Sequence, residues 1–193
     1  PIILGHVLLG APAAWAFAKF HFRGKKILYT LYIVLMLMPF QVTMVSSYLV
    51  LNKMGLIDTV WAVILPGAAS TLPVFIMTRF FMDIPEAVME AAAVDGASSF
   101  QTFLRFGLPL GAPGILSAVV LGFLEYWNAI EAPQAFLKNQ ALWPLSLYMS
   151  NITADNAGVS LIASLITLMP PLLIFLFGQK YLEQGIISSG MKD

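Results

Sequence analysis

Several polar side chains that could bind a hydroxyl-rich solute stand inside otherwise apolar stretches of this sequence. Carboxylates and amides hydrogen-bond to hydroxyl groups, and an indole ring packs on the flat face of a sugar. A charged side chain at the centre of a membrane-spanning helix costs about 2.5–3.5 kcal/mol on insertion scales, so it marks a functional candidate by default. The candidates for the lining of a solute path are Gln41, Glu125, Trp127, Asn128 and Glu131.

Helical periodicity brings most of these candidates together near the end of one apolar run. In a continuous helix, Glu125, Asn128 and Ala132 share one face, and Glu131 lies beside that face. We therefore expect a polar stripe next to Trp127 that lines the path. The alternative for Glu131 is a position among the outer lipid headgroups, where water solvates its carboxylate.

Other chemistry has little support in the sequence. There is no cysteine, and the 2 histidines, His6 and His21, have no second ligand at metal-binding spacing. We expect both to be interfacial histidines. No glycine-rich G-x-x-x-x-G-K-S/T loop is present, so ATP would have to bind to another chain. We expect no catalytic residue, no metal and no cofactor, and we interpret the chain as a non-enzyme.

The composition defines the environment in which the polar candidates act. The chain has 193 residues, of which 59% are hydrophobic and 10% are charged, against roughly 25% charged in a typical soluble domain. Its 10 basic and 10 acidic residues cancel. A secreted disulfide scaffold, a nucleic-acid-binding protein and a disordered chain are therefore excluded. What remains is an all-α membrane protein, a polytopic bundle of transmembrane helices.

Long apolar runs predict where the chain crosses the membrane, because a helix needs about 20 mostly apolar residues to span the hydrocarbon core. We expect a single membrane domain built from five such runs, residues 2–20, 27–51, 60–81, 113–132 and 159–177. Pro39 lies midway along the second run, just before Gln41. It is our candidate hinge, because proline frees a backbone carbonyl and kinks a helix.

The positions of lysine and arginine orient the spans, because cytoplasmic loops carry an excess of both. Lys53 and Lys138 fall on one side of alternating spans. Eight basic residues share the other side: Lys19, Arg23, Lys25, Lys26, Arg79, Arg105, Lys180 and Lys192. We therefore place the C-terminus, with a tail of residues 181–193, in the cytoplasm and Pro1 outside. Five spans that begin outside are one short of an even number, so we expect a further span before Pro1.

The longest predicted cytoplasmic connection, residues 83–112, has helix signals of its own. Asp83 is typical of an N-cap, and the proline and glutamate that follow it favour the first turn of a helix. We expect this helix to continue to about Val94, where Asp95 and Gly96 favour a turn.

A second short helix is indicated just after that turn. Ser98 and Gln101 have the spacing of a capping box, in which each side chain bonds to the other residue's backbone N–H. We expect a helix from here to about Phe106, ended by Gly107 and Pro109. Two short helices at the cytoplasmic surface form a platform for a soluble partner.

The order and spacing of six residues in this connection resemble the EAA motif of ABC importer permeases: Glu90, Ala91, Ala92, Gly96, Leu108 and Pro109. The surrounding residues are similar to the carbohydrate-uptake branch of that family, in particular to the maltose-type permeases of the second-subunit kind. Residues 55–59 and the pair Trp127–Asn128 resemble weaker signatures of the same branch. The family usually carries isoleucine where Phe106 stands, an exchange that preserves an apolar contact.

This resemblance implies a type I ABC importer permease fold in the cytoplasmic membrane of a bacterium or archaeon. It implies that the chain, embedded in the lipid bilayer, works with a second permease subunit, two ABC ATPase subunits and an extracytoplasmic sugar-binding protein. The chain would form half of the translocation pathway for a sugar. The residues expected to couple it to the ATPase are Glu90, Ala91, Ala92, Asp95, Gly96, Arg105, Leu108 and Pro109. Gly96 is expected to serve a backbone angle, and Arg105 to pair with an ATPase carboxylate.

Alternative functions remain open at this point. Within transport, the solute could instead be a polyol, a glycerol phosphate or an amino acid. An intramembrane enzyme would need paired catalytic groups at one depth, and none is visible in the sequence. A channel or secondary transporter acting alone should still conduct when Gly96 is replaced by a bulky residue, whereas an ATP-coupled permease should not.

Overall fold

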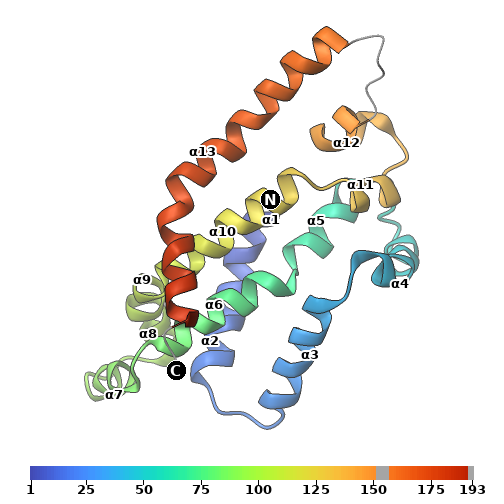
Figure 1. Cartoon of the computed structure of the whole chain (residues 1–193). Helices are drawn as coiled ribbons and strands as arrows, with labels where there is room; N and C mark the ends of the chain where they lie inside the picture. The colour runs from blue at the N-terminus through green and yellow to red at the C-terminus, as the bar shows by residue number, and fades with distance from the viewer. Residues whose placement is uncertain (151–156, 191–193) are drawn as a thin grey trace.

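The computed structural model describes residues 1–150 and 157–190, and over these residues the chain is helical with no strand (Figure 1). The all-α expectation is confirmed. Three helices are long and apolar enough to cross a membrane: Ile2–Lys19, Trp61–Asp83 and Leu161–Glu183. Two further pairs of helices pass the same test together but are sharply bent, which gives up to five spans over the described residues.

The first span is one continuous helix with a widened turn near its start. It consists of α1 (Ile2–Gly5), a π-helical turn (His6–Gly10) and α2 (Ala11–Lys19). The π turn lies just before Pro12, which has no N–H to donate and whose ring would press on the preceding turn of a regular α-helix. A widened turn relieves that contact, so the helix continues through the proline.

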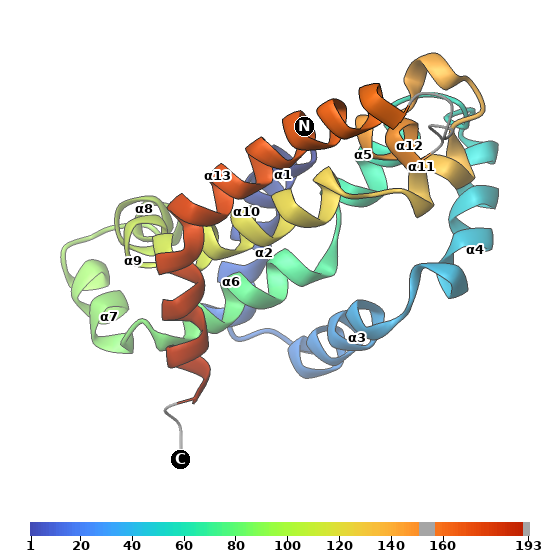
Figure 2. The same cartoon turned by 45° about the horizontal axis from the view of Figure 1, so that its top comes forward.

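Helices α2, α6 and α10 form the centre of the bundle (Figures 1 and 2). The span of α6 (Thr71–Asp83) begins as α5 (Trp61–Ala68), with a short break between the two, and α10 covers Ala112–Trp127. Their contacts bury a cluster that includes Trp15, Met77 and Phe81, of which Phe81 and Met77 are fully buried. Because lipid tails are as apolar as the helices, this close packing of side chains is what holds the bundle together.

The second predicted run is bent. Helix α3 (Lys25–Leu37) and α4 (Phe40–Lys53) meet at an angle of 106°. The break falls at Met38 and Pro39, both in extended backbone conformations with ψ of 126° and 149°, because a proline disfavours helical geometry in the residue before it. The predicted run over 27–51 thus consists of two helices, and whether they form one span stays a prediction, while Pro39 stands at the bend as expected.

The fourth predicted run is shorter than expected. Helix α10 ends at Trp127, and Asn128 closes it with its own side chain, whose Nδ2 donates to the Leu124 carbonyl at 2.8 Å. Residue 131 instead begins a separate helix, α11 (Glu131–Phe136), which is followed by a 3-10 turn (Gln140–Leu142) and α12 (Leu145–Ser150). The expected span over 113–132 is thus wrong in its last turn.

A clasp joins the turn after α4 to the turn after α11. Asp58 has a left-handed backbone with φ of 62°, and its N–H donates to the Phe136 carbonyl at 2.9 Å. Its Oδ1 accepts from the backbone N–H groups of Lys138 and Asn139, both at 2.8 Å. This end of the bundle lies opposite the end that carries α7 (Glu86–Val94) (Figure 1).

The last helix, α13 (Ala157–Gly190), crosses the outside of the bundle and turns in its C-terminal part (Figure 2). It packs on α10, where Gly178 lies against Val120 and the Ser117 hydroxyl donates to the Tyr181 carbonyl at 2.8 Å. The predicted tail of residues 181–193 therefore continues this helix to residue 190, and residues 191–193 lie outside the described part of the chain.

Candidate functional site

The first helix of the connection 83–112 starts later than predicted. Asp83 is the last residue of α6, and the N-cap of α7 is Pro85, which offers no side-chain acceptor. Ile84 and Pro85 have extended backbones with ψ of 123° and 142°, so the chain turns a corner between the two helices. The expectation that Asp83 caps this helix is wrong, because Phe81 and Ile84 are buried in the core and extend α6 to this point.

The end of α7 has the predicted turn. The Gly96 N–H donates to the Ala93 carbonyl at 3.0 Å, and the Ala97 N–H donates to the Ala92 carbonyl at 2.9 Å. This pair of bonds is a Schellman motif, which needs a left-handed residue just after the helix. Gly96 supplies it with φ of 76°, and the predicted backbone role of this glycine is confirmed.

The second short helix begins with the predicted capping box. The Ser98 N–H donates to Oε1 of Gln101 at 2.9 Å, and the Gln101 N–H donates to the Ser98 hydroxyl at 3.3 Å. The helix then runs as α8 (Ser99–Thr102), a π-helical turn (Phe103–Gly107) and α9 (Leu108–Leu110).

Gly107 and Pro109 do not end this helix, and that prediction is wrong. As at Pro12, a π turn stands just before the proline and makes room for its ring. The chain bends only at Gly111, where α10 sets off at 69° to the helix before it.

The α7–α8 connection presents an apolar surface that includes Val94, a residue that the sequence prediction did not single out. Val94 is 87% exposed and Phe100 is 67% exposed, one on each side of the Gly96 turn. Glu90, Ala91, Asp95, Arg105 and Pro109 are also exposed, whereas Ala92 is buried and Leu108 is half-buried. Ala92 therefore packs inward and is not itself available to a partner. The missed signal is a large apolar side chain directly before and after a turn-forming pair.

An aromatic cluster fixes this connection to the bundle. The ring of Phe103 lies 5.7 Å from that of Trp15 on α2 and 6.4 Å from that of Phe81 on α6, and Trp15 and Phe81 are 5.2 Å apart. Gly107 lies directly on Trp15, since a Cβ added there would stand 2.9 Å from the indole Cζ3. The helix that follows the α7–α8 connection is therefore packed on α2 through Trp15 and on the end of α6 through Phe81.

The pathway candidates do not form one stripe. Glu131 lies on α11 and accepts a hydrogen bond from the Gln41 side chain of α4, with Nε2 and Oε1 separated by 2.7 Å. Both residues are exposed, as is Glu125 on α10. Because α10 ends at Trp127, the predicted shared face of Glu125, Asn128 and Ala132 is wrong.

Trp127 and Asn128 line a pocket of about 340 Å³ between the end of α10, α12 and α13. The indole Nε1 donates to the Thr167 carbonyl at 3.1 Å, and Ser146 and Ser164 add hydroxyl groups to the lining. Of the five pathway candidates, these two share the pocket, Gln41 and Glu131 bond to each other, and Glu125 stands apart.

His6 is a buried structural residue, so its predicted interfacial position is wrong. It is 1% exposed, and its Nε2 lies 2.9 Å from the carbonyl oxygen of Gly67, which also accepts from the Tyr126 hydroxyl at 3.4 Å. These bonds tie α10 and the first span to α5. Over the described residues, no group of three or more His, Asp or Glu side chains is placed to hold a metal ion.

Comparison with known proteins shows a likeness over nearly the whole of this chain. The sequence model of the family described as binding-protein-dependent transport system inner membrane component matches residues 6–188. A probable ABC transporter permease of Pyrococcus horikoshii is 33% identical over 97% of this chain and 70% of its own length. The arabinooligosaccharides transport system permease AraQ of Halalkalibacterium halodurans is 26% identical over 99% of this chain and 70% of its own.

A further relative and a solved structure are also similar to this chain. The osmoprotective compounds uptake permease GgtD of Synechocystis is 31% identical over 94% of this chain and 63% of its own length. Among solved structures, the crystal structure of a bacterial ABC transporter involved in the import of the acidic polysaccharide alginate matches with a TM-score of 0.78 at 21% identity. That match covers 92% of this chain and 69% of the solved one.

Proposed function

The chain belongs to the family of binding-protein-dependent transport system inner membrane components, and on that premise we propose that it is the sugar-translocating subunit of an importer driven by ATP hydrolysis on partner chains. As a permease of this family it is a membrane-embedded subunit of an ABC importer. The proposal adds the solute, the coupling route and the partners: a second permease, two ATPase subunits and an extracytoplasmic sugar-binding protein.

The observation that carries the coupling route is the construction of the α7–α8 connection. A glycine turn ends α7 and a capping box begins α8, and the connection presents Val94 and Phe100 to the outside. At the same time Phe103 joins it to Trp15 and Phe81 inside the bundle. A motor subunit that gripped the exposed side chains would thus move the helices that surround the solute path. Exposed Arg105 and Glu90 add charges of both signs for docking.

The proposed orientation places this connection in the cytoplasm. The connection and the basic turn between α2 and α3 lie at the same end of the bundle (Figure 1), and the Lys19 ammonium donates to the Ile84 carbonyl just before α7. Cytoplasmic loops carry the excess of lysine and arginine. The clasp at Asp58 and the pocket at Trp127 then face the outer side, where a binding protein would deliver the solute.

Sugar is favoured as the solute by the relatives named for oligosaccharide transport and by the indole and hydroxyl groups around the Trp127 pocket. A small non-sugar solute is the second candidate, because one relative is named for osmoprotective compounds. Tight binding of a non-carbohydrate by the cognate external binding protein would exclude the sugar assignment.

The test of coupling replaces Gly96 with valine. A β-branched residue is strained at φ of 76°, and left-handed backbone costs roughly 1–2 kcal/mol in L-residues. We expect ATP hydrolysis by the assembled transporter to lose its stimulation by loaded binding protein, and solute uptake into proteoliposomes to stop. Gly96→Asn should retain both activities, since asparagine tolerates this conformation.

Gly55 offers a matched control at the other end of the bundle. It has φ of 70° and forms the same motif after α4, with its N–H 3.0 Å from the Asn52 carbonyl and the Leu56 N–H 2.9 Å from the Leu51 carbonyl. An added Cβ meets nothing within 4 Å at Gly55 or at Gly96, so both valine variants carry the same local strain. Equal loss of coupling in the two variants, or unchanged uptake with Gly96→Val, would contradict the proposal.

A further inference from the structure

The chain turns a corner between α6 and α7, and one carbonyl at this corner has a partner far away in the sequence. The last carbonyl groups of a helix have no donor within that helix. The Pro85 carbonyl accepts from the Val88 N–H at 3.1 Å, within the first turn of α7. The Ile84 carbonyl instead accepts from the ammonium of Lys19, which ends α2 and lies 65 residues earlier. The corner is therefore closed by a side chain of another helix.

Two carboxylates stand on either side of this corner and attract the same ammonium. Asp83 is the last residue of α6, and Glu86 is the first residue of α7. Both lie close enough to Lys19 to interact with it electrostatically. An ammonium carries three donors and no acceptor, so one lysine is able to serve a carbonyl and two carboxylates. Lys19 thus faces acceptors from both helices that meet at the corner.

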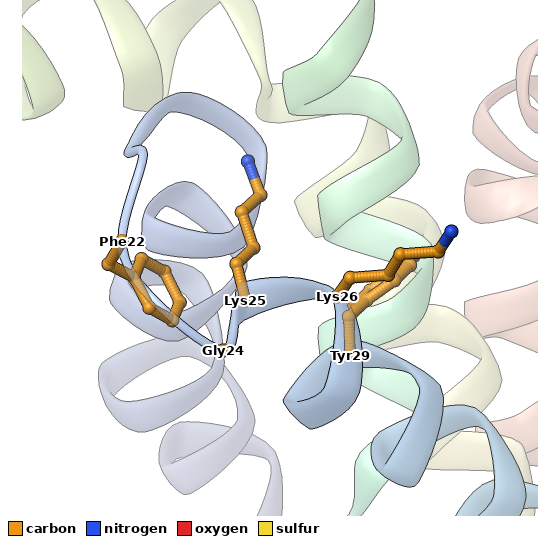
Figure 3. Close-up of a pocket in the computed structure, with 5 residues that line it drawn as sticks. All are labelled: Phe22, Gly24, Lys25, Lys26 and Tyr29. Carbon is orange, nitrogen blue, oxygen red and sulfur yellow. The ribbon is translucent and has the colours of Figure 1, made fainter.

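The neighbouring lysines are directed elsewhere. Lys25 repels Lys19 electrostatically, but its own side chain points back to the loop before α3, where its Nζ donates to the Phe20 carbonyl at 3.0 Å (Figure 3). The Lys26 side chain is exposed and extends in another direction (Figure 3). Lys19 therefore differs from Lys25 and Lys26 in reaching the α6–α7 corner.

The same face of α2 also contacts the far end of the α7–α8 connection. Trp15 lies four residues before Lys19, so the two side chains project from one face of the helix. The Trp15 ring lies 5.7 Å from that of Phe103 and directly against Gly107, where the chain returns to the bundle. Helix α2 therefore contacts the chain both where it leaves the bundle for α7 and where it comes back after α8.

We propose that Lys19 is a positioning residue for ATP-driven transport, because it fixes the direction in which α7 leaves α6. The inference rests on the proposed function, since the role of Lys19 is to hold the α7–α8 connection in the orientation that the motor subunit binds. Without the ammonium, the Ile84 carbonyl loses its donor, and the nearby carboxylates of Asp83 and Glu86 lose the positive charge between them. The extended residues Ile84 and Pro85 then allow α7 to leave α6 in more than one direction.

The first experiment measures the direction of α7 in the assembled transporter in detergent. The chain has no cysteine, so spin labels on it attach only at introduced sites. Leu4→Cys on the first span and Ala87→Cys on α7 place labels at two exposed positions, and pulsed electron paramagnetic resonance gives the distance between them. Lys19→Met keeps the aliphatic stem and removes the charge, so it should broaden this distance distribution. Lys19→Arg keeps the charge and the donors and should restore the narrow distribution.

The second experiment measures solute uptake per ATP hydrolysed in proteoliposomes. A hydrogen bond to a charged group shifts a conformational equilibrium by about tenfold or more, so we expect Lys19→Met to lower this ratio about tenfold. Glu86→Gln changes an exposed side chain and leaves the bond to the Ile84 carbonyl in place, so it should lower the ratio less. Lys19→Arg should restore the ratio together with the narrow distance distribution.

Lys26→Met is the matched control, because it removes one exposed lysine from the same basic turn. It should change neither the distance distribution nor the uptake ratio. Equal effects of Lys19→Met and Lys26→Met, or no rescue by Lys19→Arg, would overturn the proposal.

Gly96→Val separates a failure of this inference from a failure of the proposed function. If Gly96→Val leaves coupling intact, the proposed function fails, and the distance between positions 4 and 87 still decides whether Lys19 positions α7. If Gly96→Val abolishes coupling and Lys19→Met changes neither measurement, only the role of Lys19 is refuted.

Discussion

The contact between α10 and α13 gives a sharp test of how this bundle is held together. Gly178 on α13 is buried against Val120 on α10. A Cβ added at Gly178 would meet the Cγ2 methyl of Val120 well inside contact distance, with Cγ1 at 3.0 Å and the Val120 Cβ at 3.3 Å. Valine is stiff at χ1 and cannot swing its methyl groups away, so Gly178→Ala forces the two helices apart.

The size of the effect follows from a comparison within the same helix. Gly158 also lies on α13, and a Cβ added there meets nothing within 4 Å. Both alanine substitutions stabilise the helix by up to about 1 kcal/mol through helix propensity. Only Gly178→Ala also destabilises the protein by overpacking, by about 1–3 kcal/mol. We expect Gly178→Ala to be less stable than Gly158→Ala by about 1–3 kcal/mol, or about 2–12 °C in melting temperature.

The assay is thermal unfolding of the purified protein in detergent, followed by fluorescence. A second variant makes the reasoning refutable: Val120→Ala removes both methyl groups and leaves only the 3.3 Å contact to Cβ. Combined with Gly178→Ala, it should recover at least about 1 kcal/mol relative to the sum of the two single changes. Equal melting temperatures of the Gly178→Ala and Gly158→Ala variants, or an additive loss of stability in the double variant, would show that the contact between α10 and α13 does not limit stability.

Two other contacts yield predictions. Asp58→Ala should lower the free energy of unfolding by about 1–3 kcal/mol, because two backbone N–H groups at 2.8 Å lose a charged acceptor. Limited proteolysis should then cut the variant near residue 138. Asp58→Asn keeps the acceptor and tolerates the left-handed backbone, so it should stay resistant to the protease. Gln41→Glu places two carboxylates where a 2.7 Å hydrogen bond stands, so it should lower both the melting temperature and solute uptake. Adding Glu131→Gln exchanges the two side chains and should restore both. If the exchange does not restore uptake, the pair has no role in joining α4 to α11.

Local signals in the sequence were sufficient for the turn that matters most to the proposed coupling. The Ser98–Gln101 box and the left-handed Gly96 both rest on residues a few positions apart, and both are confirmed. Such features depend on backbone groups that have no other partner nearby, so distant parts of the chain do not change them.

Predictions that depended on distant contacts failed for a common reason. His6 bonds to a carbonyl 61 residues away, and no pattern around His6 points to Gly67. The polar stripe beyond Trp127 failed because periodicity assumes an unbroken helix, whereas Asn128 bonds back to Leu124 and ends it. The α3–α4 bend was partly visible at Pro39, but α4 also packs on α11, and the sequence does not reveal that contact.

The two π turns have a consequence for counting along the chain. Each residue of an α-helix advances the side chains by about 100°, but a π turn fits one extra residue into a single turn of the helix. The side chains on either side of His6–Gly10 therefore keep the faces that they would have in a regular helix one residue shorter. Removing one residue from this turn would leave the same face of the first helix toward α5 and α10. It would also remove the widened turn that accommodates Pro12, so that the proline ring would press on the preceding turn.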